Sequence, residues 1–371
     1  MAELYEAAAH EPLTATPWDE ELVALAIRRI VADAEAAVRD GGWPNHPLDD
    51  DEPTPLPETT SAVYLGAAGM VWALHSLGTS LDVPELATRA LERFRVEPDF
   101  GIVAPGLWAG ESGIMLVAKI VGGEFDVERL RALVRENVRN EAWELMWGSP
   151  GTIVAARVAG LDDEWRESCE VLAGEWDRDS GLWTQHLPDA GKDYQFIGPA
   201  HGYAGNVHAL REALPDEALR AAVGQTLRRL AVVEDGLGNW PPTLGAGLTR
   251  LQWCHGAPGL VATVGDLMPE DLMLAGAELT WQAGPLAKGP GICHGTAGNG
   301  YALLRAHVLT GDEVWLGRAR AFAMHALEQV DSTRTSYGRG RYSLFTGDVG
   351  AALFARACID VDPRFPALDL W

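Results

Sequence analysis

Two kinds of helical segment alternate along this chain. One kind is apolar on nearly every side, as in residues 70–74 and 301–304, and such a segment predicts a buried inner helix. The other kind has an apolar stripe beside a charged face, which predicts an outer helix with one side in water. The first outer segment has its expected stripe at Leu22, Ala26, Ile30, Ala34 and Val38. Its start is predicted at residues 16–19, with Thr16 as the N-terminal cap and a proline at the first helical position.

Each inner segment opens with the pattern Gly-x-x-Gly. The pattern occurs seven times in this role, with first glycines at Gly66, Gly110, Gly148, Gly202, Gly256, Gly295 and Gly347. Successive copies are 38 to 54 residues apart, which is the length of a helix pair with its loops. One copy has no weight in a chain with 41 glycines, but seven copies that each precede an apolar segment indicate a repeated helical hairpin. We expect the glycines themselves to serve packing, where the starts of inner helices crowd one another.

Seven hairpins of this kind predict an all-α fold, an α/α-toroid with an inner and an outer ring of helices. No hairpin can bury its apolar inner helix alone, whereas a closed ring buries all of them without exposed ends. We therefore predict a single domain that spans residues 1–371. Three stretches depart from the helical rhythm: a proline-rich acidic connection near residues 40–61, and extended or hairpin excursions at residues 181–187 and 236–251. They are expected to cover or line one mouth of the ring.

The residues just before the inner helices carry the candidate chemistry. If the hairpins alternate regularly, all inner helices begin at the same end of the ring, and the residue before each first glycine faces the same mouth. In chain order these residues are Leu65, Ala109, Trp147, His201, His255, His294 and Thr346. Cys254 and Cys293 stand one position earlier in the fifth and sixth copies. Neighbouring hairpins would therefore present two Cys-His pairs, with His201 beside them.

Two thiolates and an imidazole form a good zinc site by ligand softness and geometry. Two arrangements of the metal site are open, since the candidate ligands are Cys254, Cys293, His255 and His294. If all four bind, the site is closed and structural; if one histidine is withheld, an open position permits catalysis.

Composition narrows the classes of function. The net charge is −24, from 53 acidic and 29 basic residues, which argues against a nucleic-acid-binding surface. Residues 1–6 do not resemble a secretory signal, and no uninterrupted apolar run reaches about 18 residues, so we expect a cytoplasmic protein without a transmembrane segment. The two cysteines outside the motifs, Cys169 and Cys358, are too scattered for a disulfide framework.

At these motifs the chain resembles the lanthionine synthetase C family, which comprises the LanC cyclases and their LanC-like relatives. The resemblance spans essentially the whole chain: seven Gly-x-x-Gly copies, with His-Gly at 201–202, Trp-Cys-His-Gly at 253–256 and Cys-His-Gly at 293–295, in that order. The histidine at position 255 makes this motif similar to that of the LanC-like proteins, since several dedicated cyclases have tyrosine there.

The resemblance implies that Cys254, Cys293 and His294 bind zinc and leave a fourth position for a substrate thiol. It implies that His201 is the acid/base residue, with His255 as the second candidate if it is not a ligand. The implied reaction joins the thiol of a peptide cysteine or of glutathione to dehydroalanine or dehydrobutyrine and forms a thioether. Coordination would deprotonate the thiol, and an imidazole would protonate the α-carbon after attack at the β-carbon.

Family members also use an acidic residue a few positions before the third glycine copy. Glu144 matches that position by spacing, although Glu141 stands close to it. The implied partners are a peptide or protein that contains a dehydroamino acid, glutathione, and a dehydratase or kinase. A locally basic stretch, residues 334–341, could hold a glutathione carboxylate or a phosphorylated residue, or could be an exposed loop.

Two other interpretations stay open at this point. One is a non-catalytic, zinc-stabilised scaffold that binds peptides or glutathione. The other uses the toroid for different chemistry, as glycosidases and prenyltransferases do. A glycosidase needs two opposed carboxylates, which the mouth positions lack. A prenyltransferase toroid usually has six hairpins.

Overall fold

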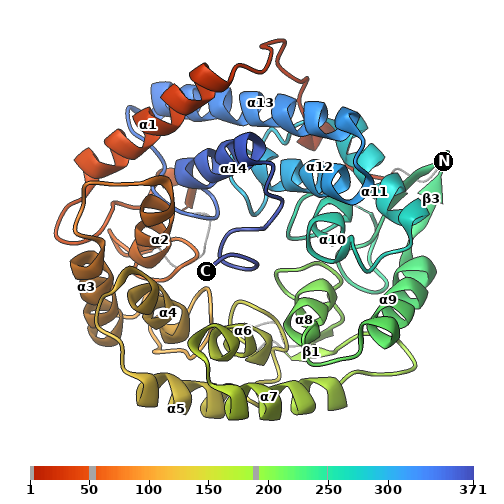
Figure 1. Ribbon diagram of the computed structural model, residues 1–371, viewed down its shortest axis with the longest axis horizontal. Helices are drawn as coiled ribbons and strands as arrows, with labels where there is room; N and C mark the ends of the chain where they lie inside the picture. The colour runs from red at the N-terminus through yellow and green to blue at the C-terminus, as the bar shows by residue number, and fades with distance from the viewer. Residues whose placement is uncertain (1–3, 50–55, 187–191, 249) are drawn as a thin grey trace.

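The computed structural model describes residues 4–49, 56–186, 192–248 and 250–371. Fourteen α-helices in these residues form two concentric rings (Figure 1). The inner ring consists of α2 (Ala67–Leu77), α4 (Glu111–Val121), α6 (Ser149–Ala159), α8 (Tyr203–Leu210), α10 (Ala257–Val264), α12 (Thr296–Thr310) and α14 (Asp348–Asp360). The outer ring consists of α1 (Glu20–Ala37), α3 (Val83–Val96), α5 (Val127–Asn137), α7 (Asp162–Gly174), α9 (Asp216–Leu230), α11 (Glu270–Ala283) and α13 (Glu313–Tyr337). The predicted α/α-toroid is confirmed.

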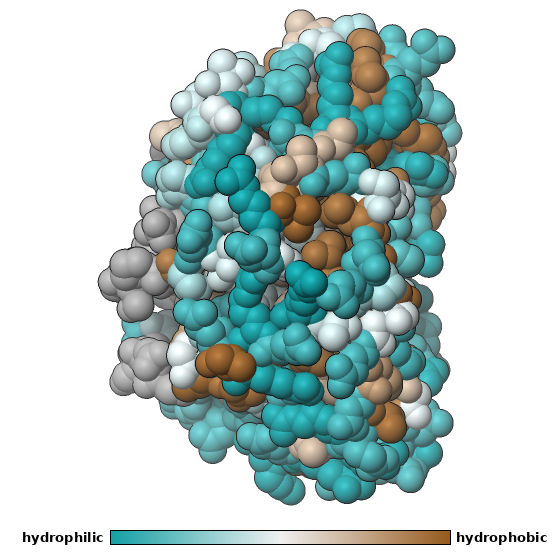
Figure 2. All heavy atoms as spheres, turned by 90° about the vertical axis from the view of Figure 1, so that its left-hand side faces the viewer, coloured by the Kyte–Doolittle hydropathy of each residue, from teal (hydrophilic) through white to brown (hydrophobic). Residues whose placement is uncertain are grey.

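Contacts between helices close the ring. Each inner helix packs against the next inner helix, and α14 packs against α2. The outer helix α1 lies mainly over α14, so the first outer helix covers the last inner one (Figure 1). The outer flank is mostly hydrophilic, with apolar groups in separate patches (Figure 2). None of the described helices is both long enough and apolar enough to cross a membrane.

The first glycine of each predicted copy is the N-cap of an inner helix in all seven cases. The second glycine lies under the loop that precedes its helix. A Cβ at any of the seven second glycines would collide with the carbonyl oxygen of the residue six positions earlier, as at Gly113 with Leu107 and at Gly259 with Trp253. The loop thus folds back onto the first turn of its helix, and only glycine leaves room for it.

We expect Gly113→Ala to lower the free energy of unfolding by about 3 kcal/mol, because the added methyl group must displace backbone that is packed on all sides. Gly317→Ala is the matched control. Gly317 is exposed in α13 and has open space around its Cβ position, so alanine there should stabilise the helix by about 1 kcal/mol. Denaturant unfolding of both variants measures the difference, and equal effects would contradict the close-approach argument.

The loops before the inner helices are joined to one another by backbone hydrogen bonds around the mouth. The donor and acceptor pairs are Tyr64 to Trp108, Ala109 to Met146, Leu145 to Ala200, Cys254 to Cys293, Cys293 to Phe345, and Phe345 to Tyr64. Their N···O distances lie between 2.8 and 3.4 Å. The last bond joins the seventh loop to the first. Among the described residues, six of the seven neighbouring pairs of loops are joined in this way, which places the starts of the inner helices side by side as the repeat predicted.

The start of α1 differs from its prediction. Asp19, not Thr16, is the N-cap, and its carboxylate accepts hydrogen bonds from the backbone N–H groups of residues 21 and 22. The Thr16 hydroxyl instead hydrogen-bonds to Glu328 of α13. The predicted stripe is shifted as well, since Leu22 is 52% exposed. The buried face of α1 is Val23, Ile27, Ile30, Val31 and Ala34.

Both extended excursions are longer than predicted and contain short antiparallel hairpins, because one strand of the first lies beyond residue 187 and one strand of the second lies before residue 236. Strand β1 (Gln185–His186) pairs with β2 (Asp193–Tyr194), and β3 (Val232–Glu234) pairs with β4 (Leu237–Asn239). The register places Gln185 opposite Tyr194 and Val232 opposite Asn239. Residues 187–191 and 249 of these excursions, and residues 50–55 of the acidic connection, lie outside the described residues.

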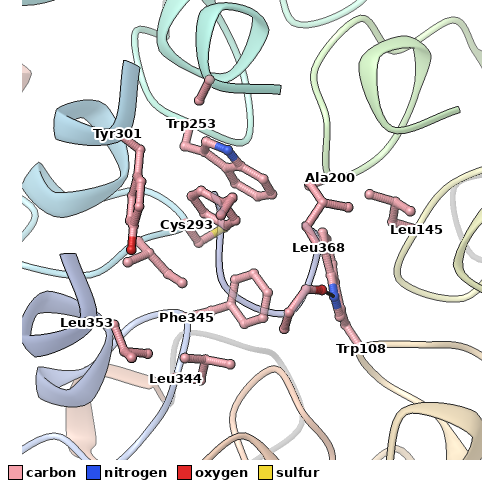
Figure 3. Packing of buried hydrophobic residues seen from close by; sticks show 14 of the residues in the cluster. Trp108, Leu145, Ala200, Trp253, Cys293, Tyr301, Leu344, Phe345, Leu353 and Leu368 are labelled. Atoms are coloured by element: carbon pink, nitrogen blue, oxygen red, sulfur yellow. Dashed lines mark hydrogen bonds between the residues drawn. The ribbon is translucent and has the colours of Figure 1, made fainter. Parts of the chain in front are cut away.

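After α14 the chain turns into the middle of the ring (Figure 1). We call residues 361–371 the central segment. Its Ala367 carbonyl accepts a hydrogen bond of 2.8 Å from the indole N–H of Trp108. Figure 3 shows Leu368 of this segment among the buried aromatic residues at the centre. The segment therefore belongs to the core of the toroid.

Candidate active site

Three predicted metal ligands lie together at the mouth. Cys254 precedes α10, whereas Cys293 and His294 precede α12, and one ligand atom from each lies within 4.8 Å of the other two. The backbone explains the meeting, because the Cys254 N–H donates a 3.1 Å hydrogen bond to the Cys293 carbonyl. Both cysteines are buried, and His294 is half-buried. It is the one cluster within the part of the chain that the structure describes whose side chains could hold a metal ion, and we call it the metal-binding group.

The donor set fits zinc. Two thiolates and one imidazole are typical zinc ligands, and three protein ligands leave a fourth position for substrate. With Zn–S bonds of about 2.3 Å and Zn–N bonds of about 2.0 Å, ligand atoms in a tetrahedral site lie about 3.5–3.8 Å apart. Ligand atoms that all lie within 4.8 Å of one another are close enough to reach this geometry by small side-chain rotations.

Two further residues hydrogen-bond to the sulfurs. The Tyr64 hydroxyl donates to Cys293 Sγ at 3.0 Å, and the Gln252 side-chain amide donates to Cys254 Sγ at 2.9 Å. The Cys293 thiol hydrogen-bonds to Cys254, which lowers the pKa of the Cys254 thiol well below its ordinary value. One cysteine of the pair is therefore readily deprotonated. The hydrogen bonds from Tyr64 and Gln252 orient both sulfur atoms. Neither Tyr64 nor Gln252 was identified from the sequence.

His201 is held by a buried carboxylate. Its Nδ1 lies 3.3 Å from Glu144 Oε2, and the Glu144 side chain is fully buried. The carboxylate also accepts hydrogen bonds of 2.8, 2.6 and 3.1 Å from the backbone N–H groups of Met146, Trp147 and Gly148. Burial lowers the pKa of His201, but the hydrogen bond and charge of Glu144 outweigh it, so the pKa is raised above the ordinary value. Glu144 is thus part of the site's structure and not a solvated surface charge.

His255 lies beside His201 and outside the group of three ligands. The two imidazole rings are 5.9 Å apart and inclined by 21°, and the Phe196 ring lies 5.9 Å from His201 and 5.8 Å from His255. Burial lowers the pKa of His255 to about 4, so this imidazole is neutral at neutral pH. Within the described residues its Nδ1 has no hydrogen-bond partner.

The backbone explains why the two Cys-His copies differ. Gln252 and His255 exchange backbone hydrogen bonds of 3.0 Å in both directions, which closes a tight turn. Gly256 then has a φ of 113°, whereas Gly295, the corresponding residue of the other copy, has a φ of −133°. Only glycine takes the first conformation readily, so the backbone that follows His255 differs from the backbone that follows His294.

Two exposed cations near the site were missed from the sequence. The charge of Arg250 opposes the rise in the pKa of His201 that Glu144 causes, and it adds to the burial that lowers the pKa of His255. The hydrogen bond with Cys254 and burial raise the pKa of Cys293, and the charge of Lys288 opposes this rise. Both residues are exposed at the mouth. The sequence could have indicated these two cations, because each stands a few positions before a cysteine of the motifs.

The basic stretch 334–341 is neither an exposed loop nor a free anion site. Arg334 belongs to α13, which extends to residue 337, and it pairs with Asp33 at 3.1 Å and with Asp348 at 3.2 Å. Arg341 is buried against Asp49, at 2.5 Å. Arg339 donates a hydrogen bond to the Asn45 carbonyl. These arginines join the acidic connection and α1 to the ring, and carboxylates inside the protein compensate the charges of Arg334 and Arg341.

Comparisons with known proteins agree with the fold and with the family resemblance. Residues 17–370 match the sequence profile described as lanthionine synthetase C-like protein. LanC-like protein GCL1 of Arabidopsis thaliana is 32% identical over 191 residues, which cover 47% of this chain and 44% of that protein. Glutathione S-transferase LANCL1 of Danio rerio is 30% identical over 196 residues, which cover 47% of this chain and 46% of that protein. These matches thus span less than half of either relative.

Among solved structures, nisin cyclase has a similar fold. The TM-score is 0.62 at 14% sequence identity, and the similarity covers 91% of this chain and 94% of that one. The shared architecture is the toroid described above. With a family profile that matches from the start of the first outer helix to the central segment, the chain belongs to the lanthionine synthetase C-like family.

Proposed function

We propose that this protein is a zinc-dependent enzyme that forms thioethers by adding a thiol to dehydroalanine or dehydrobutyrine. The observation that carries the proposal is the arrangement of two groups at one mouth. The metal-binding group of Cys254, Cys293 and His294 lies near the pair of His201 and Glu144, because the His201 ring lies 5.9 Å from the ring of His255, the residue after Cys254, and the charge of Cys254 raises the pKa of His201. A thiol-activating group and a proton donor are the two functions that this addition requires.

Zinc held by the two cysteines and His294 would deprotonate a substrate thiol, which is otherwise mostly protonated at neutral pH. The protein's contribution is to orient the ligands. Tyr64 and Gln252 hold the sulfurs, and the backbone bond between the two loops holds the cysteines at a constant separation. Such outer contacts typically change metal affinity or activity 10- to 100-fold when they are removed.

His201 is the proposed proton donor. The substrate thiolate attacks the β-carbon of the acceptor, and the electron pair of the double bond moves onto the α-carbon and its carbonyl as an enolate. Protonated His201 then transfers its proton to the α-carbon, and the proton that the thiol released returns through solvent to His201, which is protonated again for the next turnover. Glu144 supports this role because it holds Nδ1, stabilises the imidazolium and leaves Nε2 for the substrate.

The raised pKa of His201 predicts the pH dependence. A donor must be protonated, so turnover should be constant at low pH and fall as pH rises through the pKa of His201. Glu144→Gln removes the charge that raises this pKa and leaves the burial that lowers it. The alkaline limb of the kcat profile should therefore move to lower pH.

Glu141→Gln is the matched control, because Glu141 is an exposed acid three positions away. It should leave the kcat profile unchanged. Thermal unfolding of both variants checks that the buried glutamine is tolerated. A Glu144→Gln enzyme with an unshifted alkaline limb would rule out His201 as the donor.

The thiol is proposed to be that of glutathione or of a peptide cysteine. The name of the Danio rerio relative assigns glutathione transfer to that protein. In this chain, exposed Arg250 and Lys288 near the histidines and the cysteines are suited to the carboxylates of glutathione. A dehydrated peptide with its own cysteine would use the same site by internal addition.

Zinc content and a mass-spectrometric assay test the proposal together. Purified protein is incubated with glutathione and a dehydroalanine peptide, and separately with a peptide that contains both cysteine and dehydroalanine. One or both peptides should gain a thioether in a zinc-dependent reaction. Zinc without either product would favour the non-catalytic scaffold, and absence of zinc would overturn the proposal.

A further inference from the structure

The central segment lies directly against the loop that carries a metal ligand. Phe365 stacks on Trp253 with ring centroids 4.1 Å apart and ring planes inclined by only 4°. Trp253 immediately precedes Cys254 in the chain. The aromatic side chains that surround this contact converge at the centre of the ring (Figure 3). A residue more than a hundred positions later in the sequence thus sets the surroundings of the metal loop.

Trp253 depends on aromatic contacts for its orientation. Its side chain is fully buried, yet within the described residues its indole N–H has no hydrogen-bond partner. Other buried tryptophans donate to backbone carbonyls, namely Trp43, Trp108, Trp183 and Trp240. Trp108 and Phe345 also contact the Trp253 ring, but at 5.9 and 6.3 Å and with steep inclinations. Phe365 is the ring that lies parallel to the indole.

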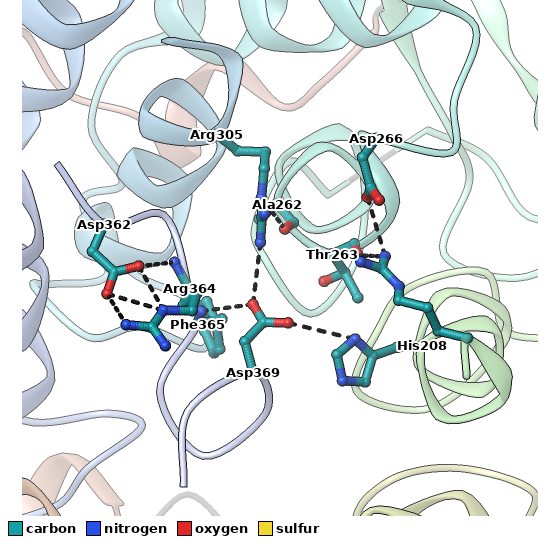
Figure 4. Close-up of polar contacts among 10 residues, drawn as sticks. His208, Ala262, Thr263, Asp266, Arg305, Asp362, Arg364, Phe365 and Asp369 are labelled. Carbon is teal, nitrogen blue, oxygen red and sulfur yellow. Dashed lines mark hydrogen bonds and ion pairs between the residues drawn. The ribbon is translucent and has the colours of Figure 1, made fainter. Parts of the chain in front are cut away.

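The central segment is itself anchored from two sides of the inner ring (Figure 4). Asp369 accepts hydrogen bonds from Arg305 of α12 at 3.1 Å and from the Phe365 backbone N–H at 2.7 Å. Its other carboxylate oxygen lies 3.5 Å from Nδ1 of His208 in α8. All three side chains of this ion-pair group are largely buried. Asp369 therefore holds the backbone of Phe365 in place.

Movement of Trp253 would be transmitted to Cys254. The Trp253 backbone carbonyl lies against Gly259 at the start of α10, with no room for a side chain between them. The neighbouring Cys254 N–H is hydrogen-bonded to the Cys293 carbonyl. The backbone between these two contacts is short, so we expect a shift of the indole to strain the peptide that carries Cys254. Ligand positions in metal sites tolerate such shifts poorly.

We propose that the central segment, through the stacking of Phe365 on Trp253, positions Cys254 and thereby sets the metal affinity of the site. Phe365 and Asp369 are positioning residues in this proposal, since neither belongs to the metal-binding group. The inference rests on the metal-binding part of the proposed function. It adds that residues inside the ring, as well as residues at the mouth, determine the zinc affinity.

The test compares Phe365→Leu with Phe322→Leu in the full chain. Phe322 is an equally buried phenylalanine in α13 that packs on Trp281, with centroids 5.9 Å apart. Zinc dissociation constants are measured by competition with a chelator, well below the unfolding temperature. Phe365→Leu should bind zinc at least about tenfold more weakly, and Phe322→Leu should stay within about twofold of wild type. The visible absorption of bound Co²⁺ should change only in Phe365→Leu.

Asp369→Asn is the second variant, because it weakens the anchor while both stacked rings remain. Asp369→Asn should also weaken zinc binding, but to a smaller extent than Phe365→Leu. If Phe365→Leu does not fold, the result for Asp369→Asn tests the proposal. Unchanged affinity and Co²⁺ absorption in the folded variants would overturn the proposal and leave the proposed function standing. Equal losses in Phe365→Leu and Phe322→Leu would also overturn it. A wild-type protein that binds no zinc would instead defeat the proposed function.

Discussion

Cys254→Ala is expected to lose nearly all bound zinc and all measurable thioether formation. The substitution removes one of three ligands and leaves Cys293 and His294, which cannot complete a tight zinc site on their own. It also removes the partner that the Cys293 thiol hydrogen-bonds in this structure. We expect bound metal to fall from about one zinc per chain to below about a tenth, and product formation to fall at least about a thousandfold.

Metal analysis of dialysed protein and the glutathione-addition assay measure both effects. Cys358→Ala is the matched control, since Cys358 is equally buried but lies in α14 and is not part of the metal-binding group. The control should keep its zinc and its activity. A zinc-free Cys254→Ala protein that still forms the thioether at the wild-type rate would exclude the proposed chemistry.

His201→Ala is expected to keep zinc and lose turnover. His201 contributes no atom to the metal-binding group, so the ligands stay in place. Removal of a positioned proton donor typically costs a factor of about 10² to 10⁴ in rate. The neighbouring His255 should not replace it, because burial keeps that imidazole neutral at neutral pH.

Single-turnover rates with saturating thiol separate the loss of proton transfer from a loss of binding. His75→Ala serves as the control, because His75 is an exposed histidine in the last turn of α2. It should behave as wild type. A His201→Ala enzyme with normal turnover would move the donor role to another group, and loss of zinc in that variant would place His201 among the ligands.

The metal-binding group and the ring could be predicted because both follow from one local rule. Each inner helix needs a glycine at its start and another three residues later, so the seven copies mark seven equivalent positions. Equivalent positions on neighbouring hairpins meet in space. The spacing of the copies was therefore sufficient to predict that Cys254 lies close to Cys293 and His294.

The difference between the two histidines of the Cys-His copies could not be predicted this way. His255 and His294 stand in nearly identical motifs, yet only His294 joins the metal-binding group. The backbone of the two copies differs at this point, with a positive φ at Gly256 and a turn closed by Gln252 and His255. A glycine permits that conformation without requiring it, so the motif alone left both arrangements open.

By itself, the sequence determined the toroid, its seven hairpins and the residues at its mouth, because these depend on periodicity and on contacts within one repeat. The tertiary structure decided what lies next to them. Tyr64 reaches Cys293 across 229 residues only because the ring closes, and Phe365 reaches Trp253 only because the central segment enters the ring. Burial of Glu144 and the internal pairing of Arg334 and Arg341 likewise depend on neighbouring elements. Such contacts join segments that are far apart in the sequence. The local pattern of one segment does not indicate which other segment it contacts.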